Sequence, residues 1–138
     1  MKVKDCYQQV TPHADLVRED TKIEDVIKVM SRNPASRAVF VVNEKEELVG
    51  IVSMQQLLNI MGIEYSKEDS ITLISQVMAK TAADIMIPPQ WVSPEDDLQE
   101  ALKLAVQHSL QDIPVVSEGK VIGNLDCFEI INNLGRSS

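Results

Sequence analysis

The first half of the chain begins with the pattern of a short strand, which is followed by the pattern of a helix. Residues 15–18 have the pattern of a short strand. Thr21 followed by Glu24 predicts a capping box at the start of a helix, and the Asn-Pro pair at 33–34 predicts its end. Between these signals, apolar side chains recur every three or four residues, as on one face of a helix: Ile23, Val26, Ile27 and Met30.

The next segment predicts two strands and a second helix. Residues 37–42 are almost continuously apolar, which is typical of a strand covered on both faces. A charged turn separates this segment from a return strand over residues 48–52. Ser53 can then cap a helix over residues 54–61, and Gly62 can end it.

The second half repeats this pattern. At an offset of 75, which sets residue 92 over residue 17, residues 92–105 match the apolar spacing of residues 17–30. The same offset carries residues 39–41 onto residues 114–116. The following turn is two residues shorter in the second half. With this deletion, Gly50 and Gly123 in the next strands coincide.

We therefore expect an α/β (α+β) fold of two β-α-β-β-α repeats. The second repeat should contain a helix capped by Asp96 and Gln99 and ending near His108, strands over residues 113–116 and 120–125, and a helix from Asp126 to Gly135. Between the repeats, an amphipathic connecting helix is indicated by the spacing of Ile71, Ile74, Val77 and Met78. The expected boundaries are 1–62 for repeat 1, 63–80 for the connecting helix and 81–138 for repeat 2.

Composition and charge narrow the class of protein. With 138 residues, 44% of them hydrophobic, the chain can bury a sizeable core. Its apolar runs are shorter than a membrane span, the N-terminus lacks an apolar signal segment, and two cysteines make no disulfide framework. We expect a cytoplasmic protein without a membrane partner. A net charge of −8 argues against binding nucleic acid.

Specific motifs then point to a family. The segments that carry the resemblance are Asp84-Ile-Met86, residues 92–102, 112–116 and 120–126, and more weakly residues 49–53. They resemble a tandem cystathionine-β-synthase (CBS) domain pair, or Bateman module, over essentially the full chain. The resemblance implies two repeats packed about a pseudo-twofold axis with two clefts between them. It also implies an adenosine-containing ligand in those clefts and a flat homodimer.

The resemblance also implies ligand-binding positions at the starts of the last helix of each repeat. The family signature there is Gly-apolar-apolar-Ser/Thr-x-x-Asp, whose carboxylate accepts hydrogen bonds from ribose. Repeat 1 keeps the hydroxyl as Ser53 but has Gln56 in place of the Asp, and repeat 2 has Asp126 and Glu129. A neutral amide accepts more weakly than a carboxylate. Alternatively, Ser53 and Asp126 are only N-caps.

Phosphate contacts in the family often come from a basic residue before the buried strand, a position occupied here by Arg37. Arg37 could instead pair with an acidic neighbour at the surface, and Asp112 in repeat 2 would oppose a phosphate. The residues that would flank an adenine are Ala35, Ser36, Leu110 and Gln111. We rank the cleft with Arg37 and Glu129 first and the cleft with Gln56 and Gln111 second.

Other reactive side chains do not form a motif. Cys6 and Cys127 are far apart in sequence; Cys127 is either a thiol whose pKa is lowered by a helix start or an inert buried thiol. His13 and Asp15 could gather a metal, with a solvated loop as the alternative. Trp91 is expected to pack at the junction between the repeats.

The functional expectation is a regulatory module rather than an enzyme, because no motif supplies both a nucleophile and a base. No cofactor, catalytic residue or metal is required. The module would sense AMP, ADP, ATP or S-adenosylmethionine and act in trans on an unknown protein partner. The acidic clefts favour a nucleoside, a monophosphate or a cationic adenosyl ligand over ATP. The alternative is a dimeric protein-interaction module that binds no nucleotide.

Overall fold

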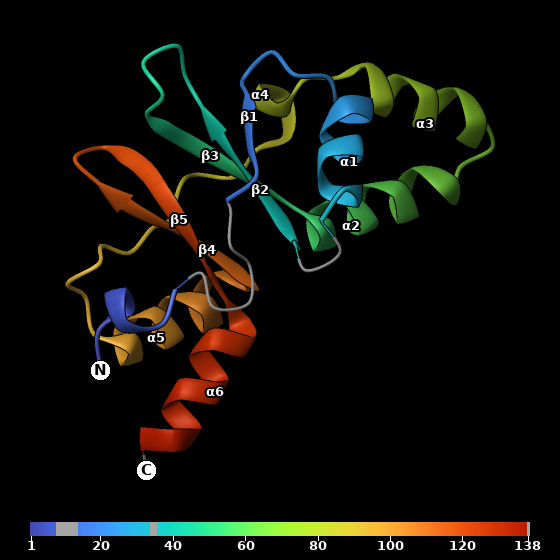
Figure 1. Ribbon diagram of the computed structural model, residues 1–138. Helices are drawn as coiled ribbons and strands as arrows, with labels where there is room; N and C mark the ends of the chain where they lie inside the picture. Colours follow the sequence, from blue (N-terminus) through green and yellow to red (C-terminus); the bar gives the residue numbers. More distant parts are fainter. Residues whose placement is uncertain (8–13, 34–35, 138) are drawn as a thin grey trace.

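Both repeats are present in the computed structural model, which describes residues 1–7, 14–33 and 36–137 (Figure 1). Repeat 1 contains β1 (Leu16–Arg18), α1 (Ile23–Ser31), β2 (Ala38–Val42), β3 (Leu48–Ser53) and α2 (Met54–Tyr65). Then come α3 (Ser70–Ala79) and α4 (Ala82–Ile85). Repeat 2 contains α5 (Leu98–His108), β4 (Asp112–Ser117), β5 (Lys120–Asp126) and α6 (Cys127–Ser137), and a 3-10 turn, η1 (Val3–Asp5), lies at the N-terminus. The predicted fold class is confirmed.

Each repeat is built on a small sheet. In repeat 1, β2 lies between β1, which is parallel to it, and β3, which is antiparallel. In repeat 2, β4 and β5 form an antiparallel hairpin. The first strand expected in repeat 2 is reduced to one parallel bridge between Val92 and Val115.

The central strand β2 is buried on both faces, as its apolar run predicts. Val39 and Val41 belong to the core that contains residues of α1 and α2. Ala38 and Phe40 belong to the other core, together with Ile113 of β4. Alternate side chains of a strand point to opposite faces, so β2 contacts its own helices on one face and repeat 2 on the other.

The N-terminal segment packs on repeat 2 rather than on repeat 1. Val3 N–H donates to the Asp96 carbonyl at 2.9 Å, and Leu98 N–H donates to the Met1 carbonyl at 2.9 Å. Val3 is fully buried in the core that contains Leu98. The start of the chain therefore completes the second half of the molecule.

The segment around α4 makes the equivalent contacts with repeat 1. Ala82 N–H donates to the Thr21 carbonyl at 2.8 Å, and Ile23 N–H donates to the Lys80 carbonyl at 2.7 Å. Ala82 is fully buried against the core of repeat 1. Each repeat is thus completed by the segment that precedes the other repeat in sequence, and the two halves interlock.

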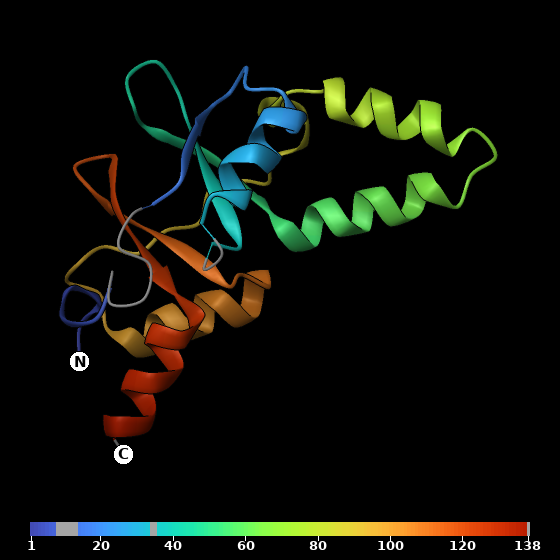
Figure 2. The same ribbon diagram turned by 45° about the vertical axis from the view of Figure 1, so that its right-hand side comes forward.

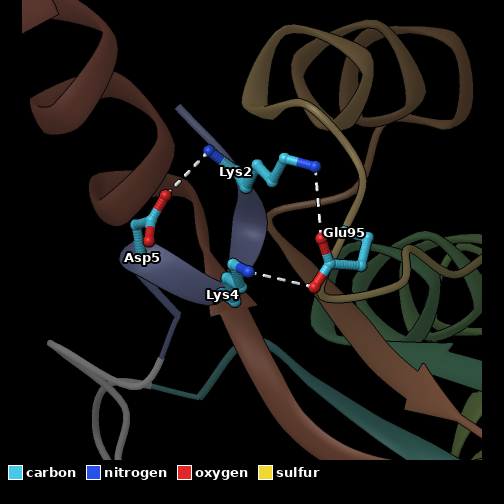
Figure 3. A network of polar contacts seen from close by, with 4 residues as sticks. All are labelled: Lys2, Lys4, Asp5 and Glu95. Carbon is cyan, nitrogen blue, oxygen red and sulfur yellow. Dashed lines mark hydrogen bonds and ion pairs between the residues drawn. The ribbon is translucent and has the colours of Figure 1, made fainter.

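Ion pairs at the surface join the N-terminal segment to repeat 2 (Figure 3). The ammonium groups of Lys2 and Lys4 each lie 3.1 Å from a carboxylate oxygen of Glu95. Asp5 accepts from the backbone N–H of Lys2 at 3.1 Å. Hydrogen bonds from Lys4 and Lys2 lower the pKa of the Glu95 carboxyl. These groups are exposed, and exposed pairs contribute little to stability.

The capping boxes predicted for α1 and α5 are wrong, since neither helix has a side-chain cap. The Thr21 hydroxyl accepts instead from the N–H of Arg18 at 3.1 Å, and Asp96 accepts from the N–H of Ser93 at 2.8 Å. The first N–H groups of both helices are satisfied by backbone carbonyls of the exchanged segments, so no side-chain cap is needed.

The predicted end of α2 at residue 61 is also wrong. The helix continues through Gly62 to Tyr65, and α3 packs back against it. Figure 2 shows α2 and α3 as a hairpin that extends away from the sheets. Within α3, Val77 is buried, but Ile71 is 83% exposed and does not face the core. In the part of the chain that the structure describes, no helix has the length and apolar character of a membrane span.

The prediction that Trp91 packs at the junction is wrong, because its side chain is 54% exposed. The next residue, Val92, is buried and pairs with Val115. Successive side chains of an extended chain point to opposite sides, so burial of Val92 directs Trp91 toward solvent.

The exchanged N-terminal segment provides a first test. We expect Val3→Ala to lower the free energy of unfolding by about 2 kcal/mol, because it removes two buried methyl groups and leaves a cavity. Lys4→Ala, one residue away, removes only an exposed ion pair and should cost about 0.5 kcal/mol. Urea unfolding followed by circular dichroism measures both. Equal effects of the two substitutions would show that the segment is not part of the core.

Candidate functional site

The paired glycines correct the alignment of the two repeats by one residue. Val41 lies opposite Gly50 in repeat 1, and Val115 lies opposite Gly123 in repeat 2. Val41 therefore corresponds to Val115, an offset of 74 in this strand and not the 75 that the sequence comparison suggested. The spacing between helix and strand differs by one residue, which side-chain type alone does not reveal.

Two backbone hydrogen bonds confirm the corrected alignment. Met54 N–H donates to the Arg37 carbonyl at 2.8 Å, and Cys127 N–H donates to the Gln111 carbonyl at 2.8 Å. The counterpart of Arg37 is thus Gln111, and the counterpart of Asp112 is Ala38, which has no polar side chain.

Asp112 links the two repeats. Its Oδ2 accepts from the backbone N–H of Arg37 at 2.5 Å, and its Oδ1 accepts from Nδ2 of Asn124 at 3.1 Å. The side chain is fully buried. Because repeat 1 has Ala38 at the same position, this contact occurs once and breaks the pseudo-twofold symmetry of the junction.

A second acid lies beside Asp112. Asp126 is directly opposite in the β4–β5 pair and is only 2% exposed. Burial raises the pKa of Asp112 to about 7, and the charge and hydrogen bond of Asp126 favour the protonated form further. Oδ1 of Asp126 accepts from the N–H of Phe128 at 2.7 Å, so Asp126 also caps α6.

Glu129, the predicted ribose-binding carboxylate of repeat 2, is buried. It is 1% exposed, and its Oε1 accepts from the N–H of Asp126 at 2.8 Å. The side chain of Asn133, one turn along α6, donates to the Glu129 carbonyl at 2.6 Å. In this conformation the carboxylate stabilises the start of α6.

Gln56, the equivalent residue of repeat 1, forms a reciprocal capping box with Ser53. The Ser53 hydroxyl accepts from Gln56 N–H at 3.1 Å, and Oε1 of Gln56 accepts from Ser53 N–H at 3.4 Å. Nε2 of Gln56 donates to the carbonyl of Ile85 near the end of α4. Ser53 is therefore an N-cap, and a ligand contact of either side chain stays a prediction.

The remaining predicted residues surround the start of β2 and β4. Ser36 is buried, and its hydroxyl donates to the Ala38 carbonyl at 2.9 Å. Arg37 is exposed, and its Nη1 donates to the Ser36 carbonyl at 3.1 Å. Leu110 is buried in the core and Gln111 is exposed. Ala35 lies outside the described residues.

Hydrogen bonds join part of this set into one network. The backbone N–H of Arg37 donates to Asp112. Asp126 lies opposite Asp112 in the β4–β5 pair, and its backbone N–H donates to Glu129. Sequence reasoning missed Asn124, which is 3% exposed and whose Oδ1 has no hydrogen-bond partner among the described residues. The signal for it was an amide inside the strand predicted over residues 120–125.

The thiols and candidate metal ligands remain outside this network. Burial raises the pKa of Cys127, and the charges of Asp126 and Asp112 raise it further, so the lowered-pKa alternative is wrong. Burial, together with the charge of Glu129, also raises the pKa of Cys6. Within residues 1–7, 14–33 and 36–137, no three His, Cys, Asp or Glu side chains are placed to hold a metal. His13 lies outside these ranges.

A hollow of about 500 Å³ lies at the opposite end of β2. Its lining residues are Arg18, Glu19, Asp20, Val42, Asn43 and Glu44. Nη1 of Arg18 donates to the Asn43 carbonyl at 2.7 Å, and its Nη2 is 3.6 Å from Glu46. None of the predicted ligand residues that the structure describes lines this hollow.

The arrangement belongs to a known class. A model of the CBS domain family matches residues 3–62 and 82–136, and the chain therefore belongs to the CBS domain family. A CBS domain-containing protein from Thermotoga maritima is 33% identical, with a TM-score of 0.85 over 99% of this chain and 95% of that chain. The structure of CBSX2 in complex with AMP is 24% identical, with a TM-score of 0.74 over 99% and 97%.

Two curated proteins are similar over most of this chain. Inosine-5′-monophosphate dehydrogenase from Aquifex aeolicus is 26% identical over 94% of this chain, which is 24% of the enzyme. An uncharacterised protein from Rickettsia prowazekii, RP505, is 26% identical over 85% of this chain and 33% of that protein. The chain thus spans a third or less of these two relatives.

The buried acid makes stability depend on pH. Folding raises the pKa of Asp112 from 3.8 to about 7, so folding favours its protonated form. Its contribution to the free energy of unfolding is present in full below about pH 4 and is lost as the pH rises through about 7. We expect this group alone to reduce stability by up to about 1.4 kcal/mol per pH unit in that interval.

Asp112→Asn should remove this decline and make the protein more stable than the wild type at pH 8. Urea unfolding at pH 5, 6, 7 and 8 measures the effect. Glu68→Gln, at the exposed turn between α2 and α3, is a control that should follow the wild-type profile. A decline of equal slope in Asp112→Asn would assign the pH dependence to other groups.

Proposed function

We propose that this protein is a regulatory module that binds an adenosine-containing ligand between its two repeats and acts on a partner protein. The observation that carries the proposal is its fold. Over 99% of the chain, it is shared with CBSX2, whose structure was determined in complex with AMP. Residues at the motif positions of this chain also lie close to the contact between repeats, at the starts of β2, β4, α2 and α6.

The charge at the junction supports one class of adenosine-containing ligand over another. Asp112, Asp126 and Glu129 are buried there, and Arg37 is the basic residue closest to them in the hydrogen-bond network. A triphosphate would bring several negative charges toward buried carboxyl groups, and charges in such surroundings interact strongly. A nucleoside, a monophosphate or the cationic S-adenosylmethionine avoids this repulsion, and we propose a ligand of this class.

Ligand binding would act by changing how the repeats sit against each other. A ligand shifts an equilibrium only by its differential affinity for the two states. A ligand that displaced the Arg37–Asp112 contact would remove a hydrogen bond that breaks the symmetry of the junction. A partner protein would then bind the changed surface with a different affinity.

The second candidate function is a protein-interaction module that binds no nucleotide. The observation in its favour is that both positions of the ribose motif are occupied by capping interactions. Glu129 is buried and accepts from Asp126, while Gln56 bonds to Ser53 and Ile85. A ligand would have to replace these bonds.

Thermal unfolding with a ligand panel tests the proposal. AMP and S-adenosylmethionine should raise the melting temperature by roughly 5–10 °C when present at about 100 times their Kd, and ATP should raise it less. Arg37→Ala should reduce the shift with AMP more than the shift with S-adenosylmethionine. If no adenosine compound shifts the wild-type protein at millimolar concentration, the second candidate is the better description.

Restoring the family's carboxylate in repeat 1 directly tests the cleft that contains Gln56. Gln56→Asp should strengthen AMP binding about tenfold, because a charged acceptor forms stronger hydrogen bonds and Asp cannot bond to the Ile85 carbonyl. Gln55→Asp, on the exposed side of the same helix, adds the same charge elsewhere and should leave AMP affinity unchanged. Isothermal titration of both variants measures the difference. No gain in Gln56→Asp would place binding outside this cleft.

A further inference from the structure

The buried carboxyl group of Asp112 lies in a cluster of hydrogen-bond acceptors. Its Oδ2 accepts from the backbone N–H of Arg37 at 2.5 Å, and its Oδ1 accepts from Nδ2 of Asn124 at 3.1 Å. Asp126, directly opposite in the β4–β5 pair, brings a second carboxyl group, which accepts from the N–H of Phe128. Oδ1 of Asn124 is a buried acceptor without a partner among the described residues. The cluster therefore has an acceptor that lacks a donor.

This arrangement favours a proton on Asp112. Two carboxyl groups that share a buried site rarely both carry a charge, because each raises the free energy of ionising the other. A protonated carboxyl group also donates a hydrogen bond, which a carboxylate cannot do. Burial raises the pKa of Asp112 to about 7, so a nearby charge decides whether the group is ionised at neutral pH.

The titratable groups packed around Asp112 come from several elements. Strand β5 contributes Asp126, helix α6 contributes Cys127 and Glu129, and the segment before β2 contributes Arg37. Asp126 and Glu129 are buried, whereas the side chain of Arg37 is exposed. Helix α5 also contacts β4, and its titratable side chains are exposed: Glu100, Lys103 and His108. The buried charges beside Asp112 are therefore acidic, and water screens them only weakly.

The residues that we expect to touch a ligand are neighbours of Asp112. Gln111 precedes it in the chain, and Arg37 is bonded to it through the backbone. A phosphate group at this place would favour the protonated form of Asp112, whereas a cationic group would favour the carboxylate. Because such coupling is reciprocal, a proton on Asp112 strengthens the binding of an anionic ligand and weakens that of a cationic one.

We propose that the proton on Asp112 selects the charge of the ligand at the junction. With the proton bound, the junction prefers an adenosine monophosphate, and with the proton released it prefers a cationic adenosyl sulfonium such as S-adenosylmethionine. This inference rests on the proposed function and adds regulation by pH to the same site. Repeat 1 has Ala38 at the position of Asp112, so the selection acts from the side of repeat 2.

The test is isothermal titration of the wild type and of Asp112→Asn with AMP, S-adenosylmethionine and uncharged adenosine, at about pH 6 and about pH 8. Asp112→Asn has the charge of the protonated form at every pH. If each charged ligand moves the pKa of Asp112 by about one pH unit, this variant should bind AMP about fivefold more tightly than the wild type at pH 8, and S-adenosylmethionine about tenfold more weakly. At pH 6 the two proteins should agree within about twofold. Adenosine should not distinguish them at either pH.

Comparison of the two proteins at the same pH cancels the titration of the ligands themselves. Glu68→Gln, which removes the same charge at the exposed turn between α2 and α3, should match the wild type at both pH values. Circular dichroism establishes that the proteins are folded at each pH. A second measurement needs no variant: titrations of the wild type in buffers of different ionisation enthalpy should show proton uptake with AMP and proton release with S-adenosylmethionine.

Equal affinities of the wild type and Asp112→Asn for AMP and for S-adenosylmethionine at pH 8 would overturn the inference. So would proton exchange of the same sign with both ligands, or failure of S-adenosylmethionine to bind the wild type at pH 8. Each of these results leaves the proposed function standing as long as AMP or adenosine binds. If none of the three compounds binds at millimolar concentration, the proposed function fails, and selection by charge fails with it.

Discussion

The backbone hydrogen bonds between each repeat and the segment preceding the other repeat are the constraint on which the rest of this structure depends. The carbonyls of Met1 and Lys80 accept from the first N–H groups of α5 and α1, and Val3 and Ala82 fill the adjoining cores. Neither helix therefore needs a side-chain cap. Since each half is completed by a segment from elsewhere in sequence, the two halves are expected to fold and unfold together. Because the halves interlock, β2 of repeat 1 packs against repeat 2, and this contact forms the junction between the repeats.

The junction is symmetric in backbone and asymmetric in charge. The same hydrogen bond joins Arg37 to α2 and Gln111 to α6, but only repeat 2 has an acid, Asp112, at the position next along the strand. Burial of this carboxyl beside Asp126 connects two properties that could otherwise be independent: the charge of an acceptable ligand and the dependence of stability on pH. In the proposed function, a ligand between the repeats has to accommodate both carboxyl groups.

The molecule divides its surfaces by charge as well. Acidic groups are distributed over the body, including the turn around Glu44 to Glu47, whereas the helices of the α2–α3 hairpin lack charge up to their tip.

The local sequence pattern was sufficient to predict many of the strands and helices. The pattern of apolar residues predicted β2, β3, α1 and α5 to within a few residues, because burial of one face or of both leaves a direct trace in sequence, and a cap residue and a glycine predicted α6. The repeat and its motifs indicated the CBS domain family. The contacts between residues far apart in sequence could be found only from the tertiary structure. Thr21 and Asp96 resemble caps but are replaced by carbonyls of exchanged segments, and α2 passes Gly62 because α3 packs against it. Glu129 and Asp112 read as cleft acids, yet only the fold shows that they are buried and which backbone groups they bind, since each of those contacts depends on strand register and on the second repeat.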